Sequence, residues 1–160
     1  MVADWNAALA RARAHAPFLA LALQRRPELA ALLAEGRGEA ALAAARAEGA
    51  GIEDTGLALR RERLSLALVL AVGDLAGAFP LARVMAELTG FADRALDAAM
   101  RAVVQRRCPD APFAGFSAIA LGKQGAGELN YSSDIDPILL YDPATLPHRG
   151  GEEPGEAAQR

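Results

Sequence analysis

A chain of 160 residues with 52% hydrophobic and 23% charged residues has the composition of one ordinary globular domain or two very small ones. Its formal net charge of −3 gives no electrostatic reason to expect nucleic acid or a membrane surface as a partner. The single cysteine, Cys108, excludes an intrachain disulfide and any multi-cysteine metal site. The best apolar run, 66–72, is far shorter than the ~18 residues of a membrane span. No secretory signal begins the chain, so we expect a cytoplasmic protein.

Residues 1–107 are predicted to be an α-helical region. The strong helix formers Ala, Leu, Arg and Glu dominate it, and apolar residues recur at helical spacing. Glycines at 36–38 and 49–51 divide its first half into short helices. Asp54 is placed to cap the long helix that follows. The segment 73–77 is expected to separate that helix from a second long one.

Residues 113–160 form a second region with a different apolar pattern. It follows a predicted turn at 108–112, where two prolines cannot continue a helix. A short apolar run, 116–121, predicts a buried strand. A short helix is expected over 123–130, and a second strand over 134–141. The predicted fold class is therefore α+β.

The last residues predict a loop and the start of a helix. The segment 143–155 is rich in proline, glycine and charge, and Pro154 is suited to a first helical turn. Because two strands do not make an independently stable sheet, we expect the chain to be a fragment of a longer protein.

Two carboxylates are the first candidates for chemistry. Asp134 and Asp136 are two residues apart at the start of the second predicted strand. On a strand they share a face, with Cα atoms roughly 6.6 Å apart. They repel each other unless a cation lies beside them, and Mg²⁺ prefers such oxygen ligands.

A glycine-rich turn supplies the second half of the candidate site. Gly122 lets the backbone approach an anion, and Lys123, the only lysine in the chain, adds a positive charge. Ser133 offers a hydroxyl to phosphate. Each element alone is a weak signal, and an Asp-x-Asp pair by itself is usually structural. The glycine spacing matches neither the P-loop nor the dinucleotide fingerprint. Together, however, the elements indicate a nucleoside triphosphate site.

The order Gly-Lys followed about ten residues later by Ser-Asp-x-Asp resembles the nucleotidyltransferase fold of the DNA polymerase β superfamily. The longer string 121–136, with the flanking segments 59–61, 74–77 and 152–158, resembles the bifunctional glutamine synthetase adenylyltransferase/adenylyl-removing enzymes. The resemblance covers the chain from about residue 57 onward. It implies that 113–160 begin a nucleotidyltransferase domain that this chain does not complete.

In that family, the N-terminal half removes AMP from a tyrosine of glutamine synthetase by phosphorolysis, and the C-terminal half adds AMP from ATP. The single motif places this chain in the N-terminal half. The resemblance implies that Asp134 and Asp136 are catalytic and hold Mg²⁺. It also implies that Gly122, Lys123 and Ser133 bind the phosphates of ATP or ADP. Glutamine synthetase and the PII signalling protein are the implied partners.

The sequence departs from the family pattern at three points. Pro137 stands where the family usually has leucine, so its strand is expected to be an edge strand or locally irregular. Gln124 replaces a usual apolar residue. The third carboxylate of the fold would lie beyond Arg160, which leaves the isolated chain without it. Two alternatives therefore stand beside the leading hypothesis: another polymerase-β-type nucleotidyltransferase, and a non-catalytic helical interaction module with an incomplete site.

Overall fold

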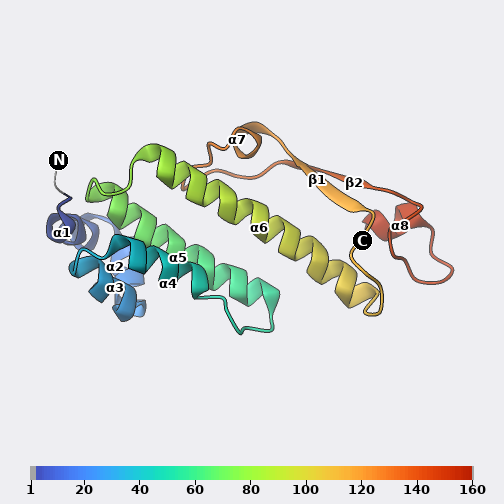
Figure 1. Cartoon of the computed structure of the whole chain (residues 1–160), viewed down its shortest axis with the longest axis horizontal. Helices are drawn as coiled ribbons and strands as arrows, with labels where there is room; N and C mark the ends of the chain where they lie inside the picture. The colour runs from blue at the N-terminus through green and yellow to red at the C-terminus, as the bar shows by residue number, and fades with distance from the viewer. Residues whose placement is uncertain (1–2, 160) are drawn as a thin grey trace. The chain divides into compact units, whose positions relative to one another are not determined.

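The computed structural model describes residues 3–159. These residues form two compact units, the first ending at Leu88 and the second beginning at Thr89. The first unit is helical, and the second combines helices with a small antiparallel sheet (Figure 1). The chain is thus mostly helical with one small sheet, which agrees with the predicted α+β class. No helix among the described residues is long and apolar enough to cross a membrane.

Short helices separated by breaks precede one long helix in the first unit, as the glycines at 36–38 and 49–51 predict. Asp54 caps the long helix, because its Oδ1 accepts a hydrogen bond of 2.6 Å from the Leu57 amide. Pro17 and Pro27 each begin a helix, where a missing amide proton costs nothing. The helices are α1 (Trp5–His15), α2 (Pro17–Arg25), α3 (Pro27–Ala34), α4 (Gly38–Ala47) and α5 (Thr55–Leu75).

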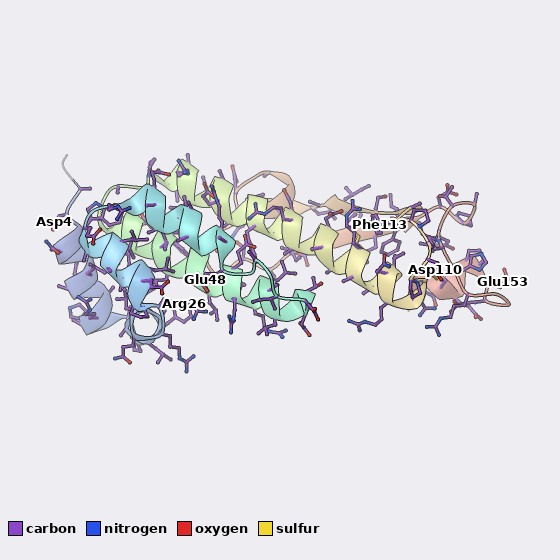
Figure 2. The ribbon with its side chains drawn as sticks, turned by 60° about the horizontal axis from the view of Figure 1, so that its bottom comes forward. Asp4, Arg26, Glu48, Asp110, Phe113 and Glu153 are labelled. Atoms are coloured by element: carbon purple, nitrogen blue, oxygen red, sulfur yellow. The ribbon has the colours of Figure 1, made fainter. Side chains whose placement is uncertain are left out.

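The core of the first unit is built around α5, which lies beside α4 (Figure 1). The second half of α5 is buried almost all round, as expected of a central helix. Its buried residues are Ser65, Leu66, Leu68, Val69, Leu70, Val72 and Gly73. The hydroxyl of Ser65 accepts a hydrogen bond of 3.1 Å from Arg26. Arg26 also forms an ion pair of 3.5 Å with Glu48, and both side chains are labelled in Figure 2. The buried hydroxyl of Ser65 is therefore satisfied by an arginine whose charge is itself paired.

Two aromatic rings close one end of this core. Trp5 and Phe79 pack edge to face, with centroids 6.1 Å apart and an interplanar angle of 84°. Glycine is required beside each ring. A Cβ at Gly38 would lie 2.4 Å from Trp5, and a Cβ at Gly73 would lie 2.1 Å from Phe79. Trp5 therefore anchors the packing at this end of the first unit.

A charged cluster lies where α4 meets the start of α6 (Leu81–Arg107). Glu87 accepts hydrogen bonds from Arg46 and from Arg83, the latter at 2.8 Å, and Arg83 also reaches Glu39 at 3.1 Å. Burial raises the pKa of Glu87, but the hydrogen bonds from the two arginines outweigh burial and hold that pKa below its usual value.

The second unit places two strands beside the remainder of α6, from Thr89 to its end. Strand β1 (Phe116–Ala120) pairs antiparallel with β2 (Pro137–Tyr141), with Phe116 opposite Tyr141 and Ala120 opposite Pro137. The prediction of a buried first strand is wrong, because this sheet has only these two strands among residues 3–159 and its outward residues stay exposed. Ile119, Ile138, Leu139, Leu140 and Tyr141 are 45–50% exposed.

The entry into β1 is fixed by the loop that follows β2. The carbonyl of Gly115 accepts from the Asp142 amide at 2.8 Å. The Asp142 carboxylate in turn accepts from the Ala144 amide at 2.9 Å and the Thr145 hydroxyl at 2.8 Å. These two donors hold the pKa of Asp142 below its usual value, the Ala144 amide being the larger cause.

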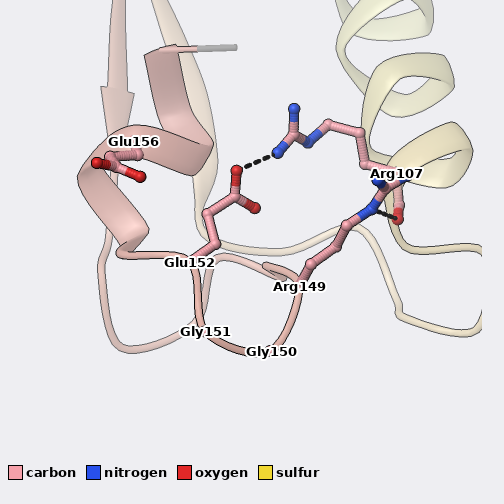
Figure 3. A pocket seen from close by; sticks show the side chains of 6 residues that line it. All are labelled: Arg107, Arg149, Gly150, Gly151, Glu152 and Glu156. Carbon is pink, nitrogen blue, oxygen red and sulfur yellow. Dashed lines mark hydrogen bonds and ion pairs between the residues drawn. The ribbon is translucent and has the colours of Figure 1, made fainter.

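The end of the described chain folds back toward the end of α6. Arg107 forms an ion pair of 2.6 Å with Glu152, and Arg149 donates to the Arg107 carbonyl at 3.2 Å (Figure 3). These residues line a shallow cavity of about 300 Å³ together with Gly150, Gly151 and Glu156. Helix α8 (Pro154–Gln159) follows, as predicted from Pro154.

Candidate functional site

The candidate site lies in the connection between β1 and β2. Gly122 has a φ of +55°, which turns the chain sharply out of β1 and into α7 (Gly122–Gly125). The helix predicted over 123–130 is therefore only one turn long. Gly125 and Gly127 favour helix poorly, and Gly127, at a φ of +75°, ends the turn by donating to the Gln124 carbonyl.

The tight packing of Gly125 is directed at the protein itself. A Cβ at this position would lie 2.5 Å from the carbonyl oxygen of Ala120. At Gly122 and Gly127 an added Cβ would meet nothing within 4 Å. The glycines of the turn thus have two roles: one lets α7 pack on β1, and the others supply a backbone conformation with positive φ.

The two candidate carboxylates precede β2 instead of lying on it. The predicted strand over 134–141 is wrong at its start, because β1 ends at Ala120, opposite Pro137, and leaves Asp136 no residue to pair with. Pro137 is the first residue of the strand, a position that tolerates a missing amide proton. Asp134 and Asp136 therefore belong to a loop, where the alternation of a strand does not decide their orientation.

Lys123, Asp134 and Asp136 are all solvent-exposed. Within the described part of the chain, none of the three side chains takes part in a hydrogen bond or ion pair. The only lysine of the chain and both carboxylates are thus available to an external ligand. Their charges are the ones that a phosphate group and a divalent cation require.

A compact hydrogen-bonded turn immediately precedes the carboxylates. The Asn130 side-chain oxygen accepts from the Ser132 amide and from the Ser133 hydroxyl, each at 3.0 Å. The same hydroxyl accepts from the Asn130 amide at 3.0 Å, and the Ser133 amide donates to the Asn130 carbonyl at 3.2 Å. Ser133, expected to contact phosphate, is therefore also the residue that closes this turn.

Two buried residues attach the connection to α6. Gln124 and Leu129 are each 4% exposed. The Gln124 side-chain amide donates to the Asp93 carboxylate at 2.9 Å, and the Leu129 amide donates to the Thr89 hydroxyl at 3.3 Å. The sequence reasoning missed Thr89 and Asp93. Their signal is a pair of polar residues four apart, which the spacing of a helix places on one face.

The donor set fits a hard cation but is small. Two exposed carboxylates on one short loop offer the oxygen ligands that Mg²⁺ prefers and leave coordination positions open to phosphate and water. No group of three or more His, Cys, Asp or Glu side chains within residues 3–159 could hold a metal ion. The described residues of this loop thus supply two carboxylates as ligands for a cation, and no third acidic, histidine or cysteine ligand groups with them within residues 3–159.

Comparison with known proteins gives a consistent result. The family model of glutamate-ammonia ligase adenylyltransferase matches residues 6–159. A bifunctional glutamine synthetase adenylyltransferase/adenylyl-removing enzyme of Caulobacter vibrioides is 38% identical over 99% of this chain and 18% of its own length. A protein of the same name from Bradyrhizobium diazoefficiens is 40% identical over 72% of this chain and 12% of its own length. The chain thus spans less than a fifth of these relatives, and no solved structure matches it.

Proposed function

The chain belongs to the glutamate-ammonia ligase adenylyltransferase family, and we propose that it supplies part of a nucleotidyl-transfer site acting on glutamine synthetase. The relatives' names give both adenylyl transfer and adenylyl removal. We assign this chain to removal, with β1, α7 and β2 as the start of a polymerase-β-type nucleotidyltransferase domain. The PII signalling protein is the further partner that we propose.

Each charged residue of the connection has a role in this proposal. Asp134 and Asp136 would hold Mg²⁺, and Lys123 would contact a phosphate through its ammonium group. The backbone of Gly122 leaves room beside it, and Ser133 would orient the carboxylate loop while its hydroxyl remains within reach of a phosphate. When bound, Mg²⁺ would neutralise the negative charge that develops on the phosphoryl oxygens.

The proposed reaction is a displacement at phosphorus. An oxygen of orthophosphate forms a bond to the phosphorus of the tyrosine-linked AMP, and the bond from that phosphorus to the tyrosine oxygen breaks. The products are ADP and an unmodified tyrosine. Lys123 would stabilise the incoming phosphate, whose own charge otherwise repels the carboxylates.

One observation carries this proposal more than any other. Lys123, Asp134 and Asp136 are exposed and have no side-chain partners within residues 3–159, while the residues between them are held by Asn130, Gln124 and Leu129. Charged groups left without partners on a supported loop are suited to an external ligand. Family membership supports the proposal that this ligand is a nucleotide.

Calorimetry with ATP or ADP, in the presence and absence of Mg²⁺, tests the binding step. The full chain is compared with the double variant Asp134→Asn, Asp136→Asn. A matched control, Glu53→Gln, Asp110→Asn, removes the same charge from two exposed acids elsewhere. We expect Mg²⁺-dependent binding that the first pair abolishes and the control retains. No binding by the folded wild-type chain would refute the site and favour a helical interaction module.

The substrate is tested separately by incubating the chain with adenylylated glutamine synthetase and orthophosphate and measuring ADP. The expected product appears only with the adenylylated protein and only with intact Asp134 and Asp136. ADP formation with unrelated AMP-tyrosine proteins at the same rate would favour another nucleotidyltransferase. Co-sedimentation with the PII signalling protein tests the second proposed partner, and its absence from the complex would exclude it.

A further inference from the structure

We propose that Thr89 and Asp93 of α6 are positioning residues that hold the Gly-Lys turn and the loop after it in a binding-competent conformation. The inference rests on the proposed function, because it assigns a role toward the same nucleotide site. Within residues 3–159, neither residue forms a hydrogen bond or ion pair with Lys123 or with the two candidate carboxylates, so both act through the residues they bind. Thr89 and Asp93 are four apart and thus lie on one face of the helix.

The first support is where burial occurs. In the connection 121–136, Gln124 and Leu129 are the buried residues, and each is 4% exposed. The residues around them, including Lys123, are exposed or half-exposed. The connection is therefore anchored at two points, which lie just after the Gly-Lys turn and just before the Asn130 turn.

The second support is that each anchor has a hydrogen bond to α6. Gln124 donates to Asp93 at 2.9 Å, and the Leu129 amide donates to Thr89 at 3.3 Å. An amide donor on a carboxylate is a charge-assisted bond, which is stronger than a bond between neutral groups. One helical turn of α6 thus fixes a side chain at one end of the connection and a backbone group at the other.

The third support is the cost of the glutamine itself. Its Nε2 faces Asp93, and its Oε1 is buried without a partner among the described residues. A buried acceptor left unsatisfied is destabilising, and an apolar side chain of similar length would avoid that cost. What the glutamine contributes is orientation: it fixes α7 relative to the Asp93 carboxylate.

Amide hydrogen exchange of the full chain tests, without any nucleotide, whether the bonds of Gln124 and Leu129 to α6 hold the connection in place. Asp93→Ala and Thr89→Val remove the two acceptors, whereas Asp93→Asn and Thr89→Ser keep them. Asp97→Ala is the matched control, because Asp97 lies one turn further along α6 and its hydrogen-bond partner among the described residues is Arg101 of the same helix, at 2.7 Å. We expect roughly tenfold faster exchange at 122–130 in the first two variants, rescue by the conservative pair and no change in the control.

Nucleotide affinity supplies the second readout. Where wild-type chain binds Mg²⁺–ATP, Asp93→Ala should weaken binding roughly tenfold while the urea midpoint of the first unit is unchanged. In a Gln124→Met background the same change should have no effect, since the donor is gone. If amide exchange at 122–130 is unchanged in both Asp93→Ala and Thr89→Val, the proposed attachment of the connection to α6 is refuted. If exchange is faster but the affinity for Mg²⁺–ATP is unchanged, the positioning role of the two residues is refuted. If the wild type binds no nucleotide, the proposed function fails, but amide exchange still tests whether Thr89 and Asp93 hold the connection.

Discussion

Gly115, which precedes β1, packs closely against the loop that follows β2, and a substitution there tests this contact. Its φ is +67°, and a Cβ added there would lie 2.3 Å from the Leu146 amide nitrogen and 2.7 Å from the Leu146 Cα. Leu146 is 6% exposed, and its amide is already bonded to the Asp142 carbonyl at 2.9 Å. The clash is thus with backbone that is itself fixed, so neither partner can move at low cost.

The expected loss of stability for Gly115→Ala combines three effects. An alanine in the left-handed region costs about 1–2 kcal/mol. Overpacking against fixed atoms costs about 1–3 kcal/mol more. The lower conformational entropy of the unfolded chain returns about 0.4–1 kcal/mol. We expect a net destabilisation of about 2–4 kcal/mol, equivalent to a urea midpoint lower by roughly 1 M or more.

Gly151→Ala is the matched control, because Gly151 has a φ of +86° in the same unit but an added Cβ there meets nothing within 4 Å. It should lose only about 1 kcal/mol. Urea unfolding is followed by tyrosine emission, since both tyrosines lie in the second unit, and by tryptophan emission, since Trp5 lies in the first. Equal midpoints for the two variants in the tyrosine signal would refute the steric argument.

Three further predictions follow from hydrogen bonds in the two units. Glu87→Gln should destabilise the first unit by about 1–3 kcal/mol at pH 7, measured by tryptophan emission in urea. Because folding lowers the pKa of Glu87, the stability difference between wild type and variant is complete above the pKa of the unfolded state. It disappears as the pH falls through the pKa of the folded state. The pKa of Asp142 is also lowered on folding, so the stability of the second unit should fall more steeply below about pH 4 in the wild type than in Asp142→Asn. Parallel pH profiles of the two proteins would contradict a stabilising role for the ionised carboxylate. Ser133→Ala should speed amide exchange across the turn that begins at Asn130, whereas Ser132→Ala, which retains its backbone bond there, should not.

Local features of this chain were predictable from the sequence alone where a single residue determines them. The Asp54 cap, the helix that begins at Pro154 and the break after α5 each depend on hydrogen-bonding or backbone properties of residues within one or two turns. The same holds for the Gly-Lys turn at Gly122, where positive φ requires glycine. The motif spacing that indicated the family also depends only on order along the chain.

Features that depend on a distant partner could not be read in this way. The start of β2 at Pro137 is decided by where β1 ends, since a strand residue needs an opposite residue to pair with. The exposure of the sheet depends on how many elements cover it, which no pattern within 116–120 records. The attachment of Gln124 to Asp93 likewise joins residues 31 apart.

The sequence by itself therefore determined the cap of α5 at Asp54, the break after that helix, the family and the identity of the charged residues at the candidate site. Tertiary structure alone decided that Asp134 and Asp136 lie on a loop and that α6 anchors the connection. The physical reason is range. Caps, turns and propensities arise from atoms a few bonds apart, whereas strand pairing, burial and the anchoring of a loop arise from contacts that exist only once the chain has folded.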